Sequence, residues 1–211
     1  YWMGKVFQAE GELKLAEIQY QRAWDMREAY EIADERYTAV YALADLYRIY
    51  GDYTRMEDQY LLIVRDDPIA SDSKNEFLRN AMVTTLTRDG FDKFMSLYRT
   101  EGDFAVDAYD ALGSFWYDSG RQGKAVLYLG LATNRILTKA IEAIRAEEPS
   151  YAYTDLSRIL KDISARPDLR EYPRSEELSR LLFTLSAALY ANGARQSARG
   201  IWRTLAAQSE G

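Results

Sequence analysis

The chain of 211 residues contains no histidine and no cysteine. These absences exclude Ser-His-Asp and Cys-His nucleophilic centres, disulfide bridges, and metal sites built from imidazole or thiolate ligands. Glycine-rich phosphate loops of the GxxxxGK[ST] and GxGxxG types are missing too. We therefore expect a protein that is not an enzyme and that holds no cofactor or metal.

Basic residues and long apolar runs are also scarce. Lysine and arginine number 27 against 33 acidic residues, and the net charge is -6. Nucleic-acid binding is driven by clustered lysine and arginine, so nucleic acid is excluded as a partner. No apolar run approaches the roughly 18 residues that span a bilayer. Strand-like alternation is absent from a sequence that is 47% hydrophobic, which predicts an all-α protein with a buried core.

The stretch from Tyr37 to Pro68 is the pattern that the rest of the chain repeats. It predicts a helix, a tight turn at Gly51 and a second helix ended by the proline. Apolar residues fall at helical spacing in both halves: Val40, Leu43, Ala44 and Tyr47, then Met56, Tyr60 and Ile63. Small Ala44 opposite bulky Tyr60 would let the two helices interlock.

At these residues the stretch resembles a tetratricopeptide repeat, whose pattern is W-x2-L-G-x2-Y, then A-x3-F, then P. The best copy has the Leu-Gly pair in place. It reads Tyr109-x2-Leu112-Gly113-x2-Trp116, then Gly120, then Ala125-x3-Leu129. Further copies lie on both sides of Gly11, as Met3-Gly4-x2-Phe7 and Ala16-x3-Tyr20, and of Gly193, as Leu182-x2-Leu185-Ser186-x2-Leu189 and Ala198-x3-Trp202. A worn copy, Leu78-x2-Ala81-Met82 with Phe94-x3-Tyr98, has its glycine, Gly90, one place late.

Five turn glycines therefore predict five helical hairpins, at Gly11, Gly51, Gly90, Gly120 and Gly193. The resemblance implies an α-solenoid, in which antiparallel hairpins stack into a right-handed superhelix. We expect hairpins 1 to 4 over residues 1–148 and a last hairpin over 175–211. A helix and loop at 149–174 do not fit the repeat, and the whole forms one continuous domain.

The first hairpin lacks the opening of its first helix, and Tyr1 is not a methionine. Because half a repeat cannot bury its own face, we expect the 211 residues to be a piece of a longer bacterial protein. The compartment stays open. A signal in a missing N-terminal part would place the protein in the periplasm or on a lipid anchor.

The resemblance also implies a concave groove lined by the first helix of each hairpin, which holds a peptide or a helix of a partner. The face opposite the inter-helix packing is predicted to point there. The candidate partner-binding residues are Tyr41, Asp45, Arg48, Arg79, Asp107, Asp110, Ser114, Tyr117, Asp118 and Tyr190. Tyrosines with a cluster of acids favour a basic or amphipathic partner segment.

Three hypotheses follow for function. The first is a non-catalytic scaffold that binds a protein through this groove. The second is a carrier of a small molecule or lipid in an apolar cavity lined by residues such as Val83, Trp116 and Phe183. The third is an enzyme that uses carboxylates, for which Asp107 and Asp110 are the closest pair, although such a pair is typical of a solvated helix N-terminus. Self-association through the first hairpin or the Trp202 helix is compatible with each.

Overall fold

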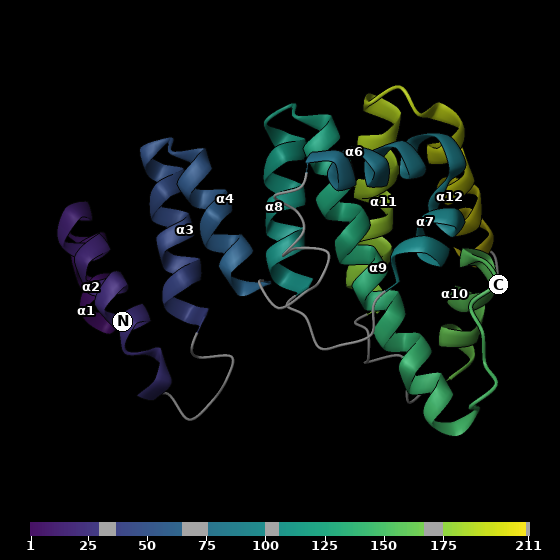
Figure 1. The fold of residues 1–211 in the computed structure, drawn as a ribbon, viewed down its shortest axis with the longest axis horizontal. Coiled ribbons are helices and arrows are strands. Elements are labelled where there is room, and N and C mark those ends of the chain that lie inside the picture. The colour runs from purple at the N-terminus through teal and green to yellow at the C-terminus, as the bar shows by residue number, and fades with distance from the viewer. Residues whose placement is uncertain (30–36, 65–75, 100–105, 167–174, 210–211) are drawn as a thin grey trace. The chain divides into compact units, whose positions relative to one another are not determined.

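The computed structural model describes residues 1–29, 37–64, 76–99, 106–166 and 175–209 (Figure 1). Every regular element within these ranges is helical, and they contain no strand, which confirms the all-α prediction. Among the described helices, none combines the length and apolarity that a bilayer crossing requires. The chain divides into two compact units, Tyr1–Asp66 and Asp67–Gly211, and each is described by itself. The expected single continuous domain stays a prediction.

Unit 1 contains two helical hairpins that follow one another in space as in the chain. The first pairs α1 (Trp2–Ala9) with α2 (Leu13–Asp25), and a short 3-10 helix, η1 (Arg27–Ala29), follows. The second pairs α3 (Thr38–Tyr50) with α4 (Tyr53–Ile63). Helix α2 packs on α3, so the second helix of one hairpin covers the first helix of the next.

Small residues opposite large ones hold each of these hairpins together. A Cβ atom at Gly4 would lie 2.5 Å from the ring of Tyr20, so the ring occupies the space that glycine leaves. The Tyr20 hydroxyl donates a hydrogen bond of 2.6 Å to the Gln8 side chain, and burial raises the pKa of Tyr20 to about 12. In the second hairpin Ala44 and Tyr60 are both buried, as the sequence predicts.

Unit 2 is built around one long helix, α9 (Gln122–Glu147). Its other α-helices are α6 (Glu76–Thr84), α7 (Phe91–Tyr98), α8 (Val106–Asp118), α10 (Leu156–Ala165), α11 (Ser175–Ala191) and α12 (Arg195–Ser209). Helices α6, α7, α8, α10 and α11 all pack on α9 (Figure 1). Every residue from Ala125 to Thr138 is buried, so this part of α9 is covered on all sides.

The turn glycines adopt positive φ at all five predicted positions. Four turns have the same hydrogen bonds: the glycine N–H donates to the carbonyl three residues back, and the next N–H donates to the carbonyl five back. At Gly51 these bonds are 3.1 Å to Arg48 and 2.9 Å to Tyr47. This is the Schellman motif, which ends a helix with a left-handed glycine. Pro68, the expected end of the second hairpin, lies outside the described residues.

The fifth turn differs, and the difference explains why Gly90 stands one place late. Residues Thr85–Asp89 form a π-helical turn, η4, and the Gly90 N–H donates to Thr85, five residues back, at 2.9 Å. A π turn takes up one extra residue within a helix. Leu86 stands four residues before its glycine, as Tyr47 does before Gly51, and is fully buried.

We predict that Gly113→Ala destabilises unit 2 by about 1–3 kcal/mol, measured by urea unfolding. A Cβ atom at Gly113 would lie 2.6 Å from Cγ of Leu129 and 2.9 Å from its backbone nitrogen, so α8 and α9 would have to separate. The matched control is Gly200→Ala in α12, where an added Cβ meets nothing within 4 Å. Alanine there is expected to stabilise by about 0.5–1 kcal/mol. Equal effects of the two substitutions would contradict the close contact.

Candidate protein-binding surface

The candidate residues of unit 1 lie on α3. Asp45 and Arg48 are exposed and form an ion pair with each other at 3.2 Å. Tyr41 is half-buried, and its ring meets that of Tyr60 edge-on with centroids 5.9 Å apart. In unit 2, Arg79 lies half-buried on α6.

The candidate residues on α8 include one that is already engaged inside the chain. The Asp110 carboxylate accepts hydrogen bonds from the Ser114 hydroxyl at 3.0 Å and from both terminal nitrogens of Arg180 on α11, one of them at 3.3 Å. The hydrogen bond to Asp110 raises the pKa of the Arg180 guanidinium above its usual value. Arg180 and Asp110 thus join α8 to α11 and neutralise each other.

The remaining α8 candidates lie along the same helix as this ion pair. Asp107 and Asp118 are exposed, one near each end of the helix, and Tyr117 is half-buried. Asp107 and Asp118 place acidic side chains on the solvent side of α8, and their role in a binding groove stays a prediction.

Helix α11 presents an apolar face next to α8. Arg180, Phe183, Ala187 and Tyr190 follow at steps of three or four residues, which places them on one side of the helix. Phe183 is 60% exposed and Tyr190 is 45% exposed. The Tyr190 ring lies 5.6 Å from that of Trp202 on α12, so Trp202 packs on the preceding helix. We name Phe183, Ala187 and Tyr190 the α11 strip.

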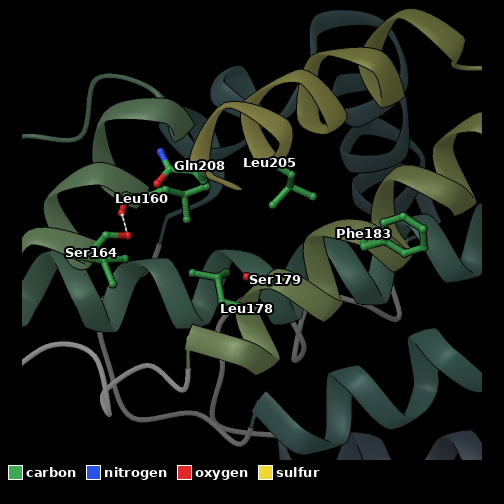
Figure 2. A pocket seen from close by; sticks show the side chains of 8 residues that line it. Leu160, Ser164, Leu178, Ser179, Phe183, Leu205 and Gln208 are labelled. Carbon is green, nitrogen blue, oxygen red and sulfur yellow. Dashed lines mark hydrogen bonds between the residues drawn. The ribbon is translucent and has the colours of Figure 1, made fainter. Parts of the chain in front are cut away.

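A pocket of about 430 Å³ begins at Phe183 and lies between α10, α11 and α12 (Figure 2). Most of its lining is apolar, with two serines and a glutamine. The lining residues are Leu160, Ile163, Ser164, Leu178, Ser179, Phe183, Leu205 and Gln208. Phe183 stands at one end, whereas Ser164 and Gln208 lie toward the other. Of the three residues named for a carrier cavity, Phe183 lines this pocket, while Val83 and Trp116 are not among its lining residues.

Sequence reasoning missed the contacts that fix the non-repeat segment to the rest of unit 2. Asp92 on α7 accepts a hydrogen bond of 2.5 Å from the Tyr153 hydroxyl and one of 2.8 Å from the backbone N–H of Leu156 at the start of α10. Burial is the main cause that raises the pKa of the Tyr153 hydroxyl above its usual value, and the hydrogen bond to Asp92 raises it further. Because 61 residues separate Asp92 from Tyr153, no local pattern signals the contact.

The described residues contain no group of three or more acidic side chains placed to hold a metal ion. The pair named for carboxylate chemistry, Asp107 and Asp110, lies within those residues. The Asp110 carboxylate is held by Arg180 and Ser114 in a contact between α8 and α11.

Comparison with known proteins places few constraints on function. No protein-family model and no solved structure matches the chain. The chain is similar to an uncharacterized protein of Treponema pallidum (strain Nichols), with 26% identity over 206 residues. The matched region is 97% of this chain and 55% of the relative, so the chain spans about half the length of that curated relative.

We predict a modest coupling between Asp110 and Arg180, about 0.5–1 kcal/mol, in a double-mutant cycle of the two alanine variants. The two side chains are 16% and 49% exposed, so solvent screens the pair in part. Urea unfolding in low salt and in about 1 M salt measures the coupling, which is expected to shrink in high salt. Arg203→Ala, an exposed arginine on α12, is the control and should change stability by less than about 0.5 kcal/mol. A coupling of zero in low salt would show that the pair does not hold α8 to α11.

Proposed function

We propose that this chain is a non-catalytic protein-interaction scaffold that binds a partner segment along α8 and the α11 strip. One observation carries the proposal. Two adjoining helices present exposed aromatic side chains on one of them and acidic side chains on the other. Exposed aromatics that gather on one helix face are typical of protein-binding sites, where aromatic residues supply most of the contact energy.

The arrangement of hairpins supports a tetratricopeptide-like solenoid for four of the five. In both units the second helix of a hairpin packs on the first helix of a following one, α2 on α3 and α9 on α11. The four hairpins concerned share the same Schellman turn. In this proposal the first helices α8 and α11 line the binding face of unit 2. Helices α6, α7 and α10 are additions that cover α9 and α12 from other sides.

The chemistry of the face defines the partner. Phe183 and Tyr190 are seven residues apart on a helix, or about 10 Å, so they fit two apolar side chains two helical turns apart. Asp107 and Asp118 are exposed acidic residues at the two ends of α8, and Asp110 between them pairs with Arg180. We therefore propose an amphipathic helical segment with basic residues beside its apolar side.

We predict that random-peptide display against the wild-type chain enriches helical peptides with two apolar residues seven apart and a net positive charge. Binding of these peptides to Phe183→Glu should be at least about tenfold weaker, which is about 1.4 kcal/mol, because the charge removes the apolar anchor. Fluorescence anisotropy with labelled peptides measures the dissociation constants.

The matched control is Phe77→Glu on α6, an aromatic residue that is 81% exposed in the same unit. It should bind the peptides as wild type does, and Asp107→Arg should weaken binding with little change in thermal stability. The proposal fails if no peptide is enriched, or if the enriched peptides bind Phe183→Glu unchanged.

The pocket favours a second candidate function, the binding of a small apolar molecule or lipid chain. Its volume of about 430 Å³ lies within the usual range for ligand sites, about 300–1,000 Å³. An apolar lining with Ser164, Ser179 and Gln208 provides hydrogen-bonding groups for one polar end. Phe183 belongs to both candidate sites, so the two functions are separated by a substitution at a lining residue outside the α11 strip.

We predict that a dansyl-labelled fatty acid binds the wild-type chain saturably and that Leu205→Trp abolishes this binding by filling the pocket. Leu97→Trp on α7, where the leucine is 54% exposed and outside the pocket, is the control and should bind as wild type does. Fluorescence titration measures both. Absence of saturable binding by the wild type would exclude the carrier function for this lipid class.

A further inference from the structure

The side chain of Phe183 lies between the pocket and the face that α8 and α11 form. On one side, Leu178 and Ser179 of the preceding turn of α11 line the pocket together with Phe183. On the other side, Arg180 bonds to Asp110 on α8. Successive residues are turned by about 100° around a helix axis, so Ser179 and Arg180 lie on either side of Phe183. Phe183 is thus the side chain that the two candidate sites share.

The Phe183 ring is exposed to water beside apolar surface. It is 60% exposed, whereas Leu178, which lines the same pocket, is 2% exposed. Because apolar groups are driven from water onto apolar surface, a turn of the ring toward the pocket is favourable. Exposed side chains change rotamer within nanoseconds, so the ring alternates between the pocket and the α11 strip. While it is turned toward the pocket, it is not offered to a partner on the strip.

We propose that an apolar molecule bound in the pocket strengthens the binding of the partner segment by holding the Phe183 ring on the α11 strip. This inference rests on the two functions proposed above and adds regulation to them. A ligand that fills the pocket occupies the space into which the ring turns. The two ligands then favour the same position of one side chain, and this shared preference couples them. The coupling is reciprocal, so the partner strengthens ligand binding by the same factor.

The lining of the pocket orients this ligand. Ser164 and Gln208 lie toward the end away from Phe183, and Leu160, Ile163 and Leu205 supply apolar surface (Figure 2). A polar head group therefore goes toward the serine and the glutamine, where it finds hydrogen-bonding groups, and an apolar chain extends toward the phenylalanine ring. A molecule with one polar end and one acyl chain, such as a fatty acid, has the chemistry of the proposed regulator.

Isothermal titration calorimetry of the wild-type chain measures the coupling in both directions. The peptides enriched by display are titrated with and without dodecanoic acid at a concentration that saturates the pocket. The peptide dissociation constant should fall at least about threefold when the fatty acid is present. In the reverse titration, saturating peptide should lower the dissociation constant of dodecanoic acid by the same factor.

Two variants separate this coupling from direct association of the fatty acid with basic peptides. Leu205→Trp fills the pocket, so dodecanoic acid should leave its peptide dissociation constant unchanged. Leu97→Trp on α7, outside the pocket, is the matched control and should respond to the fatty acid as the wild type does. Circular dichroism checks that both variants are folded. An equal response of Leu205→Trp and the wild type would overturn the inference.

The outcomes also separate the inference from the functions on which it rests. If each ligand binds alone but dodecanoic acid leaves the wild-type peptide dissociation constant unchanged or raises it, the inference is wrong and both proposed functions stand. If either ligand fails to bind the wild type, the inference falls together with the function to which that ligand belongs.

Discussion

The complete burial of the middle of α9 is the constraint on which the rest of unit 2 depends. A helix that is covered on every side needs neighbours on every side, and a stack of two hairpins covers only the faces toward α8 and α11. The buried part of α9 also carries polar side chains that cannot be left half-covered. Arg135 and Asn134 are 1% and 0% exposed, and the Arg135 guanidinium donates a hydrogen bond of 2.9 Å to the Asn134 side chain. Helices α6, α7 and α10 complete the enclosure.

The helical hairpins are predictable from the sequence because their determinants are local. Apolar spacing, a turn glycine and a small residue opposite a large one all lie within about 40 residues, and each follows from the geometry of two antiparallel helices. The turn glycines Gly51 and Gly120 accordingly separate α3 from α4 and α8 from α9. The placement of α6, α7 and α10 is beyond such reasoning. It depends on contacts such as that of Ser197 on α12 with the Thr87 carbonyl, 110 residues apart, which leave no periodic trace in the sequence.

The late glycine of the third hairpin shows that a departure from a pattern can itself be structural information. Gly90 stands one place late only if the residues between Met82 and the turn are counted as regular α-helix. The π turn adds a residue to that count, and the side chains of Thr85 and Thr87 bond to carbonyls four residues back at 2.9 and 2.8 Å within it. Such bonds favour helix distortion. The result is close packing against α9, because the Leu86 side chain fills the space beside Gly130. A Cβ atom at position 130 would lie 2.6 Å from Cδ1 of Leu86.

The candidate surface illustrates a limit of reading faces one helix at a time. Helical spacing assigns both Asp110 and Arg180 to the groove side of their helices, where each would be offered to a partner. Once α8 and α11 adjoin, Arg180 of the same chain pairs with Asp110, and the two charges are used within the fold. The binding energy proposed for this face then comes mainly from burial of Phe183 and Tyr190, at roughly 25 cal/mol for each Å² of apolar surface. The acids at the ends of α8 contribute orientation and association rate more than affinity. A charged face read from sequence thus becomes an aromatic face with charged edges once its helices are placed together.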